Sequence, residues 1–139
     1  MKGRLNFIVG GVGMMVSVVA ALALGITFDD HGQREGLYLF SVVQFYLRFA
    51  HTHGMPLSLY NLIVGLCLGI LDMSPRRRKL AAWGAASTWL IPILMTLKGA
   101  LGAPANFPHV EIIGILGLVV SSGLLVAAAR NETAAEPAR

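Results

Sequence analysis

The chain has little charge and a single cysteine, and the first of these shortages restricts what kind of protein it can be. Of its 139 residues, 13% are charged, which is about half of the roughly 25% that soluble domains carry. The one thiol, Cys67, has no partner for an intramolecular disulfide, so the sequence shows no sign of an oxidising compartment. The scarcity of charge excludes an ordinary soluble domain.

Charged residues are absent from four long stretches. The gaps cover residues 5–28, 49–71, 80–97 and 112–129, with lengths of 24, 23, 18 and 18 residues. A helix needs roughly 17 to 25 apolar residues to cross about 30 Å of hydrocarbon. The sequence therefore predicts an all-α, integral membrane four-helix bundle. It forms a single membrane domain, 1–139, with spans at about 5–27, 55–71, 80–97 and 110–129.

The segments between the spans carry their own signals. Residues 36–49 are apolar and aromatic but offer only twelve consecutive residues without a charge. This is too few to cross a membrane, so we expect an interfacial helix before span 2. Pro92 predicts a kink in the third span. The glycines and prolines of 99–109 predict a loop, and the polar residues 130–139 predict a frayed tail.

Small residues recur along the first span at a spacing of four: Gly13, Ser17, Ala21 and Gly25. This spacing places them on one face of a helix, where a neighbouring helix can approach closely. We therefore expect close helix packing on this face, and we expect the protein to be a homo-oligomer through its small-residue faces.

Basic residues are distributed unevenly between the two sides of this topology. Eight lie on one side, namely Lys2, Arg4, 76–79, Arg130 and Arg139, and three lie on the other, namely Arg34, Arg48 and Lys98. The positive-inside bias then predicts a multi-pass protein of the inner (plasma) membrane with both termini in the cytoplasm. Because most basic residues stand at the ends of apolar spans, the net charge of +4 does not indicate nucleic-acid binding.

The densest group of chemistry-bearing residues lies at the start of the second span. His51 and His53 occur there, and Tyr60 and Asn61 follow within the apolar span. On a helix, His53 and Tyr60 share a face with Asn61 at its edge, whereas His51 points the other way. If a loop instead enters the helix at Met55 or Pro56, both histidines can face one site. The spacing alone does not choose.

Three interpretations of the histidines follow from these positions. They can lie at the membrane interface, bonded to lipid headgroups or to His109 and Glu111. A zinc or copper site would need three or four ligands, and hence the convergence of His51, His53 and His109. A haem needs only one axial histidine beside an apolar cleft, and Arg48 could hold a haem propionate.

The stretch from Arg48 to Pro56, followed by Asn61 in a small four-span protein, resembles the styrene oxide isomerase family. The resemblance implies a trimer of four-helix subunits that bind haem b, whose ferric iron opens a small hydrophobic epoxide as a Lewis acid. Such bundles are also distantly similar to the haem-copper oxidase core. The family's Ala-His step matches Ala50 and His51. The family also has a proline three residues after its histidine, and Pro56 has this spacing from His53. The family's third-span tyrosine is absent here, and the resemblance leaves Tyr60 as its replacement.

The leading hypothesis is thus a haem b-binding membrane protein that acts as an epoxide isomerase. His53 is the preferred iron ligand and His51 the alternate, Arg48 is the propionate partner, and Tyr60 and Asn61 orient the substrate oxygen. The alternatives are a non-enzymatic membrane subunit, a small-solute or proton transporter that uses the histidine pair, or a purely structural bundle.

Overall fold

A computed structural model describes residues 2–32, 42–101 and 106–135, and every regular element in these ranges is a helix. The helices are α1 (Arg4–Gly32), α2 (Val42–Ile70), α3 (Pro75–Ser87), α4 (Leu90–Ala100) and α5 (Glu111–Ala135). Four segments are long and apolar enough to cross a membrane: Arg4–Leu22, Arg48–Ile70, Pro75–Ala100 and Glu111–Asn131. The all-α four-helix bundle is confirmed, with α3 and α4 together forming the third span.

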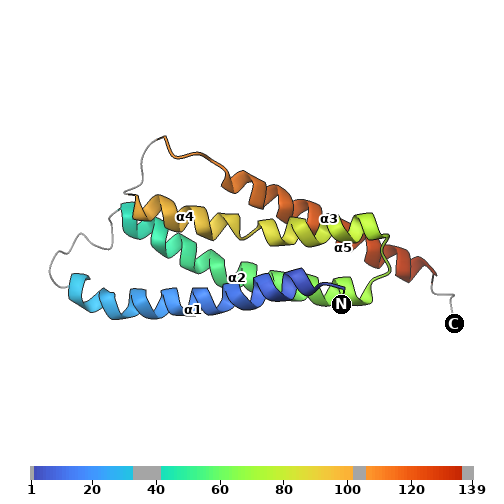
Figure 1. The fold of residues 1–139 in the computed structure, drawn as a ribbon, viewed down its shortest axis with the longest axis horizontal. Helices are drawn as coiled ribbons and strands as arrows, with labels where there is room; N and C mark the ends of the chain where they lie inside the picture. Colours follow the sequence, from blue (N-terminus) through green and yellow to red (C-terminus); the bar gives the residue numbers. More distant parts are fainter. Residues whose placement is uncertain (1, 33–41, 102–105, 136–139) are drawn as a thin grey trace.

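The spans run up and down in sequence order (Figure 1). The helix α1 packs on α2, α2 packs on α4, and α3 packs on α5, which leaves α1 and α5 at opposite edges of the bundle. The N-terminus, the connection from α2 to α3 and the last turns of α5 lie at one end, which we call the basic end because it carries Lys2, Arg4, Arg76, Arg77, Arg78, Lys79 and Arg130. We call the opposite end, where α2 and α5 begin, the histidine end, because His51, His53 and His109 lie toward it.

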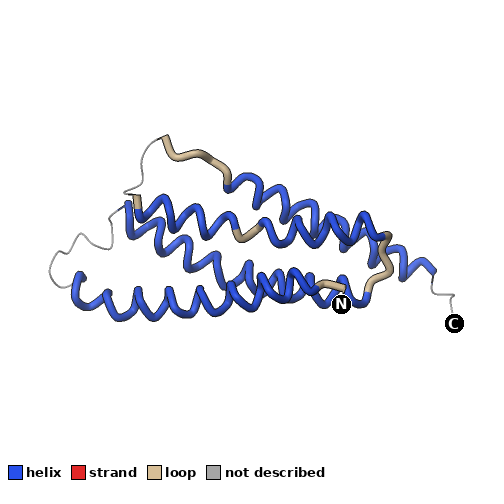
Figure 2. The backbone as a smooth tube through the Cα atoms, viewed as in Figure 1, coloured by secondary structure: helices blue, strands red, loops and turns tan. Residues whose placement is uncertain are grey.

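The third span is interrupted at Thr88 and Trp89 (Figure 2). Pro92 has no N–H to give to the Thr88 carbonyl four residues earlier, and the Ile91 N–H donates to that oxygen instead, at 3.1 Å. The N–H groups of Thr88 and Trp89 likewise donate to carbonyls only three residues back. The expected effect of Pro92 is confirmed, and it falls one turn before the proline.

Two helices extend beyond their predicted limits. Residues 42–49 are the first two turns of α2 rather than a separate interfacial helix, because the helix continues without a break through Gly54 into the span. Residues 36–41 lie outside the described part of the chain. Pro56 is accommodated inside α2, so the loop entering at Met55 or Pro56 is wrong. At the other end of the chain α5 continues to Ala135, and the tail predicted to fray at 130 is helical to that point.

The predicted small-residue face of α1 is partly used within the chain. The Trp89 ring covers Gly13, and Ser17 packs against Gly54, so α2 and the turn before α4 approach α1 closely at these positions. Further along the same face, a Cβ placed at Gly25 would meet no atom of the described residues within 4 Å. The apolar core lies toward the basic end, where α2, α3 and α5 meet around Val64, Leu68, Met73, Ala81, Ala85 and Ala128.

Candidate functional site

His53 lies in the middle of α2, where its ring is held by the turn that precedes it. Its Nδ1 lies 2.9 Å from the carbonyl oxygen of Phe49, and the Phe49 ring stacks on the imidazole with 3.9 Å between centroids. A carbonyl oxygen can only accept, so Nδ1 carries the proton and the lone pair resides on Nε2. His53 is half-buried. It therefore presents an imidazole whose Nδ1–H is donated to the helix and whose ring plane is fixed, which leaves Nε2 as the atom that could ligate a metal.

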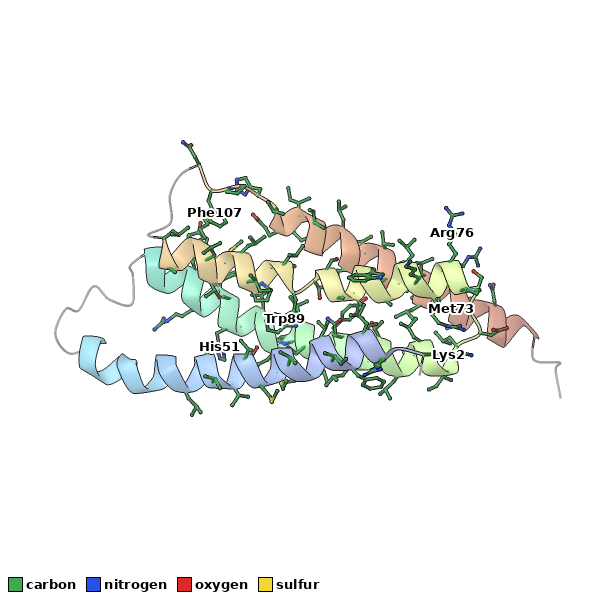
Figure 3. The ribbon with its side chains drawn as sticks, viewed as in Figure 1. Lys2, His51, Met73, Arg76, Trp89 and Phe107 are labelled. Atoms are coloured by element: carbon green, nitrogen blue, oxygen red, sulfur yellow. The ribbon has the colours of Figure 1, made fainter. Side chains whose placement is uncertain are left out.

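His51 lies on the other side of the same helix. Two residues correspond to about 200° of rotation, and Figure 3 shows His51 between α2 and α1. Its Nδ1 is buried and has no hydrogen-bond partner among the described residues. Arg48, one turn earlier, is only about 60° from His51 around the helix but about 140° from His53. The helical structure of this segment thus keeps the two histidines from sharing one site on α2, and groups Arg48 with His51.

Asn61 is fully buried and joins three helices. Its Nδ2 donates to the Ala85 carbonyl at 3.0 Å and to Thr88 Oγ1 at 3.2 Å, both on the third span. Its Oδ1 accepts from Asn6 Nδ2 at 3.0 Å, and Asn6 Nδ2 also donates to the Ala82 carbonyl. Asn6 was not among the predicted site residues. Its signal in the sequence is an amide within the charge-free stretch of the first span.

Tyr60 links α2 to α5. Its hydroxyl lies 2.7 Å from Ser121 Oγ and 2.9 Å from Ser122 Oγ, and Ser121 also donates to the Gly117 carbonyl at 2.6 Å. Among the described residues, no hydrogen bond connects His53 with Tyr60 or Asn61. Seven residues separate His53 from Tyr60, or about 10 Å along the helix axis. The two residues share a face of α2, as expected, and they engage different partners.

Lys98, on α4, lies near the same face of α2 and was not singled out as a site residue. Its Nζ lies over the Tyr46 ring, 4.7 Å from the centroid, and over the Phe107 ring at 5.8 Å. Tyr46 precedes His53 by seven residues, so it stands on the same face of α2, about 10 Å nearer the histidine end. This face of α2 therefore carries the Tyr46 ring and the His53 imidazole, and the Lys98 ammonium of α4 lies beside it. The contact unites α2 and α4, and spacing within one segment does not reveal it.

The described residues contain no group of three or more His, Cys, Asp or Glu side chains that could hold a metal ion. His109, which is exposed, pairs with Glu111 at 2.9 Å. The convergence of His51, His53 and His109 that a zinc or copper site requires is thus not formed within the described chain. A cofactor held by one imidazole is compatible with the donor set at His53. Comparison with protein-family models, curated proteins and solved structures gives no match for the chain.

Proposed function

We propose that this chain is a membrane protein that binds haem b through Nε2 of His53. The observation that carries the proposal is the bond from His53 Nδ1–H to the Phe49 carbonyl. Ligating histidines characteristically donate their second ring nitrogen to a carbonyl or carboxylate, which fixes the tautomer and orients the ring. His53 meets this requirement without a further residue, and haem needs no more than one such ligand from the protein.

Other side chains on this face suit a haem. Phe49 stacks on the imidazole and restricts its rotation. Lys98 is the cation best placed on this side of α2 to bind a propionate, because Arg48 lies about 140° away around the helix. We therefore assign the propionate role to Lys98 in place of Arg48.

The reaction we propose is the isomerisation of a small hydrophobic epoxide to a carbonyl compound. Bound ferric haem supplies Lewis-acid chemistry toward the epoxide oxygen. Tyr60 lies on the same face of α2 as His53 and carries a hydroxyl in the apolar span, so we assign it the orientation of the substrate oxygen in addition to its bonds to α5. Asn61 donates to two groups of the third span, and its contribution is to hold that helix in position.

Absorption spectroscopy of the purified protein, expressed with ample haem, tests the proposal. The wild-type protein should show a Soret band. His53→Ala should abolish it and leave the protein inserted, because the four apolar spans remain. His51→Ala is the matched control and should retain the band. Loss of the band in His51→Ala alone would move the ligand to His51. Absence of haem in the wild-type protein would overturn the proposal in favour of a transporter, a non-enzymatic subunit or a structural bundle.

We propose that the basic end faces the cytoplasm in the inner (plasma) membrane, because the basic residues gather there. Ser74 lies at that end and is exposed, and Asn106 is exposed at the histidine end. In a Cys67→Ala background, a membrane-impermeant thiol reagent added to intact cells should label Asn106→Cys and spare Ser74→Cys. The reverse pattern would overturn the orientation.

We propose a homo-oligomer, with the trimer taken from the family resemblance. Support comes from the part of the α1 small-residue face that the described residues leave uncovered, at Gly25. Gly25→Leu should therefore shift the native mass spectrum toward monomers. An unchanged distribution would exclude this face from the subunit contact.

A further inference from the structure

The basic end concentrates positive charge. Seven basic residues occur there, namely Lys2, Arg4, Arg76, Arg77, Arg78, Lys79 and Arg130, against the acidic residues Asp72 and Glu132. Figure 3 shows Lys2 and Arg76 at this end but on different sides of the bundle. Four of the seven are consecutive at the start of α3, so the strongest positive field lies beside that helix.

One face of α3 changes from basic to apolar along its length. Arg76, Leu80 and Trp83 are spaced at i, i+4 and i+7 and therefore share a stripe. Leu80 is 53% exposed and Trp83 59% exposed, while Arg76 and Lys79 are exposed beside them. The opposite side of α3 holds the buried residues Ala81 and Ala85. The stripe thus faces outward, with cations at the membrane surface and a large apolar surface below them.

The start of α3 offers additional donors. Ser74 is the N-cap residue and makes no side-chain capping bond, so the N–H groups of the first turn are not satisfied by it. These N–H groups favour an anion at this end of the helix.

We propose that the stripe Arg76–Lys79–Leu80–Trp83 is a binding site for an anionic phospholipid. Arg76 and Lys79 bind the headgroup phosphate, and Leu80 and Trp83 contact the first part of an acyl chain. The apolar half of the stripe distinguishes this ligand from inorganic phosphate, which has no group to place against Leu80 and Trp83. Basic clusters at the ends of membrane helices recognise anionic lipids through this combination of charge and depth.

Trp83 makes the site directly observable. In the Trp89→Phe variant Trp83 is the sole tryptophan. Its fluorescence is measured in phosphatidylcholine vesicles that contain a small fraction of phosphatidylglycerol, with bromine on the acyl chains of one lipid or the other. The site predicts that brominated phosphatidylglycerol quenches Trp83 with an apparent affinity at least about fivefold higher than brominated phosphatidylcholine. Equal quenching by the two lipids would overturn the proposal.

A matched pair of double variants separates a site from general attraction. Arg76→Gln with Lys79→Gln should abolish the preference, whereas Lys2→Gln with Arg4→Gln removes the same charge from the same end and should preserve it. An equal loss of the phosphatidylglycerol preference in both double variants would show that the total positive charge of the basic end causes it, and would reject the site. Millimolar inorganic phosphate should leave the preference unchanged, and its loss would indicate a free-phosphate site. If Trp89→Phe does not fold, the wild-type protein is compared with Trp83→Phe, which should lose the lipid preference; its retention would contradict the proposal.

Discussion

The polar side chains in the two halves of α2 differ in their hydrogen-bond partners. In the half nearer the basic end, Asn61 and Tyr60 bond to other helices, to the third span and α1 in one case and to α5 in the other. In the half nearer the histidine end, His53 bonds to its own helix and His51 leaves Nδ1 without a partner among the described residues. Asn61 and Tyr60 thus connect helices, whereas each histidine keeps a ring nitrogen without a hydrogen bond to the described residues.

This difference separates architecture from function within a single helix. A polar group at membrane depth is costly unless it is paired. Asn61 and Tyr60 meet that requirement through hydrogen bonds to other helices, so both contribute to helix packing. His53 has an oriented imidazole whose Nε2 has no hydrogen bond to the described residues. This is the ring nitrogen that the haem we propose would use.

The largest effect on stability is expected for Asn61→Ala. The change removes the bonds to Ala85 and Thr88, deprives Asn6 of an acceptor and leaves a cavity at a fully buried position. We expect a loss of about 2 kcal/mol in the free energy of unfolding, measured by denaturant titration in mixed micelles. Asn106→Ala, at an exposed asparagine, is the control and should cost less than about 0.5 kcal/mol. Similar losses in the two variants would show that Asn61 does not connect the helices.

Tyr60→Phe should have a smaller effect. It deletes the hydroxyl that bonds to Ser121 and Ser122 and keeps the ring, and Ser121 retains the Gly117 carbonyl as an acceptor. We expect a cost of about 1 kcal/mol in unfolding free energy and an unchanged Soret band. A double-mutant cycle with Ser121→Ala measures the coupling, which should be about 0.5 to 1 kcal/mol. A coupling near zero would mean that this bond contributes nothing to packing.

Much of the fold was predictable because the membrane imposes it. Gaps between charged residues located the four spans, and Pro92 predicted the interruption of the third, since a missing N–H acts locally. The helix ends were less predictable: polar residues end a membrane span but do not end a helix, whose hydrogen bonds are internal. For this reason α2 begins at Val42 and α5 continues to Ala135.

The site was only partly predictable because its partners come from other helices. Helical periodicity gave one of two open arrangements, in which His51 and His53 lie apart and His53 aligns with Tyr60, and the continuous helix α2 decides in its favour. It contained no information about which helix would meet Tyr60, so neither the serines of α5 nor the amide of Asn6 was anticipated. The approach of Lys98 to the Tyr46 ring is likewise a contact between two helices.

Phe49→Ala should affect the cofactor more than the fold. The Phe49 ring stacks on His53 at 3.9 Å, and its carbonyl, which accepts from His53 Nδ1, remains in the variant. We expect haem affinity, measured by titration of the apoprotein, to fall about fivefold, because a stacked pair contributes about 1 kcal/mol. Phe49→Tyr keeps the ring and is the control. Unaltered affinity in Phe49→Ala would show that the stacking does not orient the ligand.

The smallest effect is expected for His51→Leu, and it tests the other half of the comparison. Leucine has a similar volume and removes a buried Nδ1 that has no hydrogen-bond partner among the described residues. Replacing an unsatisfied polar group by an apolar one of similar shape costs little, since the lost packing is offset by the relieved desolvation. We expect a change within about 0.5 kcal/mol in unfolding free energy and a normal Soret band. A loss of 2 kcal/mol or more would place His51 with Asn61, as a residue that connects helices. A lost Soret band with normal stability would instead make His51 the haem ligand, and the oriented imidazole of His53 would then need another explanation.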